Sequence, residues 1–169
     1  EWVEFEGYAI YAYEASRPGA SADRLGLDLT PDDGIRSYVE VRPCSKPGVL
    51  PWSEVTWMEA RAACEAIDAR LCRIEEWQRA CGGPEMESYP YGNRSIDRIC
   101  NGGKFDTDAD TVEDDDGPLP YGNRPECVRD GIYDLSGNLK EWVNDGVDNL
   151  RSVRGGSFET DTDTALTCQ

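Results

Sequence analysis

The chain has 169 residues, enough for one domain that buries about two-thirds of its unfolded surface. Its 34 acidic and 17 basic residues give a formal net charge of −17. A surface this negative repels phosphate backbones and anionic lipid, so we do not expect binding to nucleic acid or to a membrane surface. Histidine is absent, which excludes Ser-His-Asp and Cys-His catalysis and histidine-ligated metal sites. The apolar runs are only a few residues long, so membrane insertion is not expected.

Residues 2–14 alternate apolar and polar side chains, which predicts a pair of strands broken at Gly7. Residues 20–50 are rich in Asp, Gly and Pro and predict a long loop with one short strand at residues 38–41. Cys44 is a candidate anchor for this loop.

Two helices are predicted next. Over residues 56–69, Thr56 and Glu59 form a capping box ahead of an apolar stripe built mostly of alanine, which favours close packing against a neighbour. Residues 74–81 predict a second, shorter helix with Trp77 facing inward.

The seven cysteines are scattered and include no Cys-x-x-Cys pair, so neither a zinc knuckle nor a thioredoxin-like motif is present. Such spacing is typical of a disulfide framework in an oxidising compartment, and buried free thiols in a cytosolic protein are the alternative. An odd number leaves one thiol free or with a partner elsewhere. The chain opens without an initiator Met, so we expect a processed or trimmed piece of an exported precursor.

A five-residue sequence, Pro-Tyr-Gly-Asn-Arg, occurs at residues 90–94 and again at 120–124, and each copy leads into a cysteine. Two matched turns of this kind suggest that Cys100 and Cys127 pair. Between them lies an acidic run from Asp106 to Asp116, which lacks the glycine and glutamate of an EF-hand. This run is either a solvated loop of repelling charges or a loop ordered by calcium.

Residues 131–142 read Gly-Ile-Tyr-Asp-Leu-Ser-Gly-Asn-Leu-Lys-Glu-Trp and place two oxygen donors, Asp134 and Glu141, seven residues apart. Between them, Gly137 and Asn138 form a turn dipeptide that can point main-chain carbonyls inward. Carboxylate and carbonyl oxygens on a tight loop are the ligands that hold a hard cation such as calcium. A plain turn between two strands is the structural alternative.

This segment, together with Arg-Gly-Gly-Ser-Phe at residues 154–158 and Arg-Leu-Cys-Arg-Ile-Glu-Glu-Trp at residues 70–77, resembles the signature motifs of the formylglycine-generating-enzyme (sulfatase-modifying factor) family. The resemblance implies a single α+β domain over residues 1–169. Its fold would be a variant of the C-type-lectin fold, with two helices, short antiparallel strands and long loops. The resemblance also implies that the chain lacks the N-terminal signal and the final C-terminal strand of the family.

The resemblance further implies one or two calcium ions. The ligands of the first would be the side chains of Asp134 and Glu141 and the carbonyls of Gly137 and Leu139. A second site would begin at Asn101 and the Gly102 carbonyl.

Three disulfides are predicted. In the family, the structural cysteine near the end of the domain pairs with a cysteine on the second helix, which implies Cys81–Cys168. The repeated turns indicate Cys100–Cys127. The partner of the cysteine on the first helix lies in the family's final strand, so that thiol is left over here. The predicted pairs are Cys81–Cys168, Cys100–Cys127 and Cys44–Cys72, with Cys64 unpaired.

The founding members of the family oxidise a substrate cysteine to formylglycine with copper held by two cysteines shortly after the Gly-Gly-Ser motif. Here the closest positions hold Thr160 and a residue near Ala165, and hydroxyl or methyl groups do not bind Cu(I). A related branch uses iron held by histidines, which this chain lacks. We therefore predict a non-catalytic member; a copper-dependent formylglycine-generating oxidase is the alternative.

Many bacterial exported proteins carry cysteine-rich domains of this family, and the chain resembles these more closely than the enzymes. A disulfide-bonded scaffold with long loops suits recognition of protein or glycan, so we predict an extracytoplasmic binding module, whether periplasmic, cell-surface or secreted. A subunit docked on a larger complex is a second hypothesis, favoured by an exposed apolar patch around Trp2, Trp52 or Trp57. A variable-loop receptor is a third, but residues 159–169 hold Thr and Asp rather than Tyr and Asn.

Overall fold

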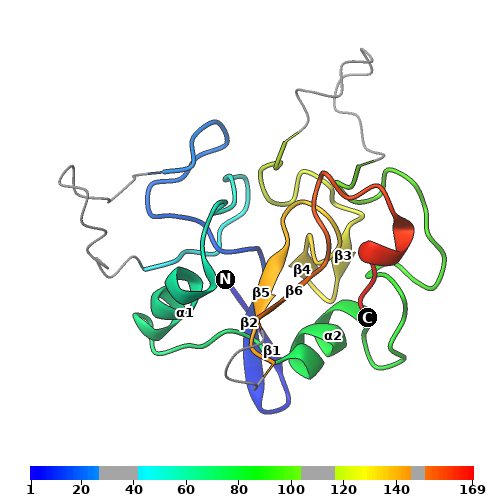
Figure 1. The fold of residues 1–169 in the computed structure, drawn as a ribbon, viewed down its shortest axis with the longest axis horizontal. Coiled ribbons are helices and arrows are strands. Elements are labelled where there is room, and N and C mark those ends of the chain that lie inside the picture. Colours follow the sequence, from blue (N-terminus) through cyan, green and yellow to red (C-terminus); the bar gives the residue numbers. More distant parts are fainter. Residues whose placement is uncertain (27–41, 104–116, 146–150) are drawn as a thin grey trace.

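The computed structural model describes residues 1–26, 42–103, 117–145 and 151–169 (Figure 1). Within these ranges, two helices and three antiparallel two-stranded sheets are joined by long loops, which confirms the predicted α+β class. The predicted strand at residues 38–41 and the acidic run from Asp106 to Asp116 lie outside the described residues. The elements are β1 (Trp2–Phe5), β2 (Tyr8–Tyr11), α1 (Trp57–Glu65), α2 (Ile74–Gly82), β3 (Val128–Arg129), β4 (Ile132–Tyr133), β5 (Glu141–Val143), β6 (Ser152–Arg154) and a 3₁₀ turn η1 (Asp163–Ala165).

The first hairpin is the predicted pair of strands broken at Gly7. β1 pairs with β2 so that Trp2 lies opposite Tyr11 and Phe5 opposite Tyr8, with the ring centroids of each pair 4.2 and 4.9 Å apart. Gly7 turns the chain at a φ of 89°, in the left-handed region where glycine meets no steric penalty. Aromatic cross-strand pairs of this kind stabilise an isolated two-stranded sheet.

Helix α1 begins as predicted but ends earlier. The hydroxyl of Thr56 accepts a hydrogen bond from the Glu59 amide, and the Glu59 carboxylate accepts one from the Thr56 amide, which completes the capping box. The helix ends at Glu65 rather than residue 69 because Asp68 adopts a left-handed φ of 58°. The amide of Ala69 then donates to the carbonyl of Cys64, which reverses the chain toward α2.

Helix α2 carries the centre of the core. Trp77 and Cys81 are fully buried on its inner face and pack with residues of the β-hairpins, as the sequence predicts for Trp77. The start of the helix has no hydroxyl cap; instead, the carboxylate of Glu76 accepts a hydrogen bond of 2.8 Å from the Arg73 amide. Arg70 pairs with both oxygens of the same carboxylate at 2.7 Å.

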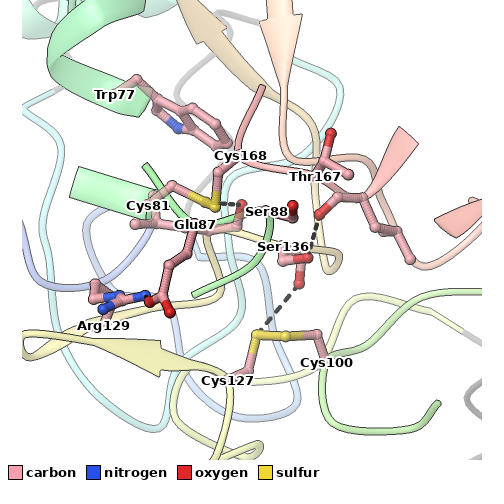
Figure 2. The surroundings of a disulfide bond; sticks show 12 residues. Trp77, Cys81, Glu87, Ser88, Cys100, Cys127, Arg129, Ser136, Thr167 and Cys168 are labelled. Atoms are coloured by element: carbon pink, nitrogen blue, oxygen red, sulfur yellow. Dashed lines mark hydrogen bonds and ion pairs between the residues drawn. A yellow bond between two sulfur atoms is a disulfide. The ribbon is translucent and has the colours of Figure 1, made fainter. Parts of the chain in front are cut away.

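Two disulfides connect distant segments (Figure 2). Cys81–Cys168 joins α2 to the C-terminal segment, and Cys100–Cys127 joins the segments that follow the two repeated turns; both are predicted pairs. Because disulfides form in oxidising compartments, they indicate a non-cytosolic location.

The predicted pair Cys44–Cys72 is wrong, because both thiols are free, as is that of Cys64. The backbones of Cys44 and Cys72 are held by different neighbours. Cys44 exchanges two main-chain hydrogen bonds with Ser16, whereas the carbonyl of Cys72 accepts a hydrogen bond from Asn144, just after β5. The sequence spacing gives no indication of this separation.

Neither helix in the described ranges has the length and apolar character needed to cross a membrane.

Replacing Cys81 and Cys168 together by alanine is expected to lower the free energy of unfolding by about 2–5 kcal/mol, because the bond closes a long loop of the unfolded chain. Urea unfolding without reductant measures the change. Cys44→Ala, which removes a thiol that forms no disulfide, is the matched control. Equal midpoints for the double variant and the control would contradict this assignment.

Candidate metal centre

The loop between β4 and β5 has the turn that the sequence predicts. Asp134, Gly137 and Asn138 all have a positive φ, at 61°, 84° and 59°. The amide of Gly137 donates to the Gly155 carbonyl at 2.7 Å, and that of Asn138 donates to the Asn101 carbonyl at 2.6 Å. The loop is therefore fixed from two sides by segments far away in the sequence.

Asn138 is buried at the centre of this arrangement, with 1% of its surface exposed. Its side-chain nitrogen donates to a carboxylate oxygen of Glu14 at 2.6 Å and to the Leu119 carbonyl at 3.2 Å. Its side-chain oxygen accepts from the amide nitrogen of the Asn101 side chain at 3.0 Å and from the Leu119 main chain at 2.8 Å. Both donor hydrogens and both acceptor positions are thus used.

Three carboxylates gather around the loop. Asp134 is 4% exposed and accepts a long hydrogen bond of 3.4 Å from the Gly122 amide. Glu141, at the start of β5, accepts a hydrogen bond from the indole N–H of Trp77. Glu14 is 9% exposed, and its second oxygen accepts from the Leu139 amide at 3.0 Å.

Burial raises the pKa of Asp134 and that of Glu141 to about 7, and the Asp134 charge adds to the shift of Glu141. Burial also raises the pKa of Glu14 well above its ordinary value, and repulsion from the other two carboxylates adds to the effect. Burial is the main cause of the raised pKa of the Tyr121 phenol, and charges on the same three carboxyl groups raise it further. Each of these carboxyl groups is therefore costly to ionise where it lies unless a positive charge offsets its own.

The donors on this loop fit a hard cation. Among the described residues, none donates a hydrogen bond to the main-chain carbonyl of Gly137 or of Leu139, the two carbonyls predicted to act with the carboxylates of Asp134 and Glu141. Within the described ranges, no three carboxylate or thiol side chains converge closely enough to hold a metal by themselves. A cation here would need main-chain oxygens as well, which is the mixed donor set that calcium accepts.

The second predicted site is only partly described. Asn101 is buried, and its side-chain nitrogen donates to the Gly117 carbonyl and to Asn138, each at 3.0 Å. The amide of the neighbouring Gly102 donates to the Cys100 carbonyl. Asn101 is therefore hydrogen-bonded to the loop of the first site. Residues 104–116, which follow it along the chain, lie outside the described residues.

Three residues that organise the centre were not among the predicted site residues: Glu14, Asn138 and Trp77. Glu14 is the last residue of the alternating segment 2–14, a pattern that assigns it no role in the site, and only its distant hydrogen bonds reveal that role. Trp77 was expected in the core, but not as a donor to Glu141. A buried indole needs an acceptor for its N–H, and that requirement is the signal that could have prompted a search for a nearby carboxylate.

The residues predicted to stand closest to the family's copper-binding thiols, Thr160 and a residue near Ala165, lie close to Gly156. A Cβ atom at Gly156 would stand 3.2 Å from the hydroxyl oxygen of Thr160 and 2.9 Å from the carbonyl of Ala165. The Thr160 hydroxyl accepts a hydrogen bond from the Ser157 amide at 2.9 Å. The two positions are close together, but neither carries a thiol.

Comparison with known proteins gives one family. The model of the sulfatase-modifying factor enzyme 1-like domain matches residues 1–167. The chain is 35% identical over 136 residues to the mouse (Mus musculus) protein named inactive C-alpha-formylglycine-generating enzyme 2, and 34% identical over 136 residues to the bovine (Bos taurus) protein of that name. The matches cover 76% of this chain but only 41% and 42% of the relatives' lengths.

Gly137→Ala is expected to be strongly destabilising, because the new Cβ would lie 2.3 Å from the Asn101 carbonyl oxygen. Gly48→Ala is the control, since Gly48 also has a positive φ, of 70°, but nothing lies within 4 Å of its Cβ position. The control should cost about 1–2 kcal/mol of unfolding free energy from backbone strain, and Gly137→Ala roughly 2 kcal/mol more. Equal losses of unfolding free energy in the two variants, measured by chemical denaturation, would show that the protein relieves the contact with Asn101 at little energetic cost.

In metal-free buffer, the stabilising contribution of the carboxylates is expected to fall as the pH rises from about 4 to about 7. The unfolded chain ionises these groups near pH 4, whereas burial keeps Asp134 and Glu141 protonated in the folded state up to about 7. The folded state therefore holds more protons across this interval, and raising the pH favours unfolding.

Thermal unfolding with chelator, compared between the wild type and Glu141→Gln, isolates this effect. Because the amide does not ionise, the free energy of unfolding of Glu141→Gln should depend less on pH than that of the wild type. The variant should therefore gain stability relative to the wild type as the pH rises from acidic to neutral. A difference between the two proteins that does not change with pH would contradict the assignment.

Proposed function

Because the chain belongs to the sulfatase-modifying factor enzyme 1-like family, we propose that it is a non-catalytic member in which calcium stabilises a disulfide-bonded binding or scaffolding module. The observation that carries the non-catalytic part is the region beside Gly156, where Thr160 and the residues near Ala165 offer no soft ligand for Cu(I). The relatives that are inactive by name support the same conclusion.

The calcium part of the proposal rests on the loop between β4 and β5. The side chains of Asp134 and Glu141 and the carbonyls of Gly137 and Leu139 would hold the ion. Its charge would stabilise the ionised form of carboxyl groups that burial otherwise keeps protonated. Bound calcium would supply structural stabilisation, since the loop is joined to distant segments through Asn138. A second ion at Asn101 and Gly102 belongs to the same proposal.

We propose that the module works outside the cytoplasm, in a periplasm, on a cell surface or as a secreted protein, and recognises a protein or a glycan. The disulfides and the small share of regular structure support a rigid, C-type-lectin-like scaffold that presents loops. Docking on a larger assembly is the second role. Of the three tryptophans in the hypothesis, Trp2 is 49% exposed, whereas Trp52 and Trp57 stack with arginine side chains.

The first test is thermal unfolding of the non-reduced protein with calcium and with chelator. Calcium at 100 times its dissociation constant should stabilise the fold by about 2.7 kcal/mol, because a ligand specific to the native state shifts the equilibrium by mass action. Asp134→Asn and Glu141→Gln should each lose most of this gain. Glu4→Gln, which neutralises an exposed carboxylate on β1, should keep it. An equal shift in all four proteins would assign calcium to another site, and no shift in the wild type would refute the calcium part.

The alternative, a copper-dependent formylglycine-generating oxidase, is tested separately. The wild type loaded with copper should leave the thiol of a cysteine peptide unconverted, as judged by mass spectrometry of the peptide. Peptide conversion is a better readout than copper uptake, because three free cysteines could also bind copper. Formation of formylglycine by the wild type would overturn the non-catalytic assignment.

A further inference from the structure

Trp77 connects the core of the protein to one of the carboxylates beside the loop between β4 and β5. It is the fourth residue of α2, and 1% of its surface is exposed. Its indole N–H donates to the carboxylate oxygen Oε2 of Glu141, 64 positions further along the chain. A buried indole N–H needs an acceptor, but a main-chain carbonyl would serve, as that of Val55 does for Trp142. The choice of a carboxylate therefore needs a separate explanation.

The indole is held against the same segments that fix the loop. The Asn144 amide, directly after β5, donates to the Cys72 carbonyl at 2.8 Å, which keeps the end of β5 beside the segment before α2. A Cβ atom at Gly155 would lie 3.3 Å from the ring atom Cζ2 of Trp77, so the ring packs on the backbone that follows β6. The Gly155 carbonyl in turn accepts from the Gly137 amide of the loop at 2.7 Å. The indole N–H therefore has a fixed position relative to both β5 and the loop.

The two oxygens of the Glu141 carboxylate differ in their partners. Oε2 accepts the indole N–H, whereas no described residue donates a hydrogen bond to Oε1. An anchored Oε2 restricts rotation of the carboxylate and so fixes the direction of Oε1. The indole is a donor only and is uncharged. It can therefore hold the carboxylate without the positive charge with which a lysine or arginine would oppose a cation.

We propose that Trp77 is a positioning residue for calcium, in that its indole N–H orients Glu141 so that Oε1 binds the ion. This inference rests on the proposed calcium function. Groups that hydrogen-bond to a metal ligand keep it in its binding geometry, and their removal typically lowers metal affinity about 10–100-fold. Without the N–H, the Glu141 side chain would lose more rotational freedom when it binds the ion.

The test is isothermal titration calorimetry of calcium into the non-reduced protein after treatment with chelator and removal of the chelator. Trp77→Phe keeps an aromatic ring in the core but has no N–H, and its dissociation constant for calcium should be about 10–100 times that of the wild type. Trp142→Phe is the matched control, because it removes an indole N–H that donates to the Val55 carbonyl at 2.9 Å. This control should keep the wild-type dissociation constant.

The two ways of failing are distinguishable. Equal dissociation constants for the wild type and Trp77→Phe would overturn the positioning role and leave the calcium site in place. No calcium uptake by the wild type would refute the calcium proposal and this inference with it.

A second variant removes the donor without changing the size of the buried ring. Trp77→3-benzothienylalanine replaces the N–H by sulfur in a bicyclic ring system of the same shape, so it remains informative if Trp77→Phe does not fold. It should weaken calcium binding about 10–100-fold, whereas the same replacement at Trp142 should not. Wild-type affinity with this replacement at Trp77 would overturn the proposal.

Nuclear magnetic resonance distinguishes positioning from packing. The five tryptophans give five indole N–H resonances in protein labelled with nitrogen-15, and the resonance missing from a Trp77 variant belongs to Trp77. Calcium should shift this resonance more than that of Trp142, because the acceptor of the Trp77 N–H becomes a metal ligand. A Trp77 resonance that stays in place while calorimetry records calcium binding would contradict the positioning role.

Discussion

One buried side-chain amide, that of Asn138, holds the described fold together at its centre. Its four hydrogen bonds join Glu14, Asn101 and Leu119 to the loop between β4 and β5. Such a group is stabilising only when every donor and acceptor has a partner, because an unpaired polar atom in the interior costs more than a hydrogen bond gains. The position of Glu14 beside the loop follows from this requirement, because its carboxylate accepts a hydrogen bond from the Asn138 side chain.

Local patterns were the easiest features to predict from the sequence. The first hairpin, the capping box at Thr56 and the inward face of Trp77 each depend on residues close together in the chain, and the structure has all three. The end of α1 was misplaced because alanine-rich periodicity continues past Glu65, whereas the left-handed Asp68 stops the helix. Periodicity indicates which residues can be helical but not where a turn takes over.

Contacts between distant residues were predictable only where a motif marked them. The repeated turns indicated Cys100–Cys127, and family resemblance implied Cys81–Cys168 and the Asp134–Glu141 loop. No pattern marked Glu14 as a partner of Asn138, since the hydrogen bond spans 124 positions. The same lack of a local signal explains why Cys44 was paired wrongly: spacing along the chain does not report which segments the fold brings together, and Cys44 and Cys72 have different main-chain neighbours.

The span of the Glu14–Asn138 contact has a consequence for how the chain reaches its native state. A fold whose central hydrogen bond joins its first and last thirds has a high contact order, and its sheets have too few strands to nucleate independently. The entropy of closing a long loop must be lost before the buried amide is satisfied, so folding is slow compared with that of a helical domain of equal length. Until then the apolar face of α2 remains accessible to other chains, which makes assisted folding advantageous.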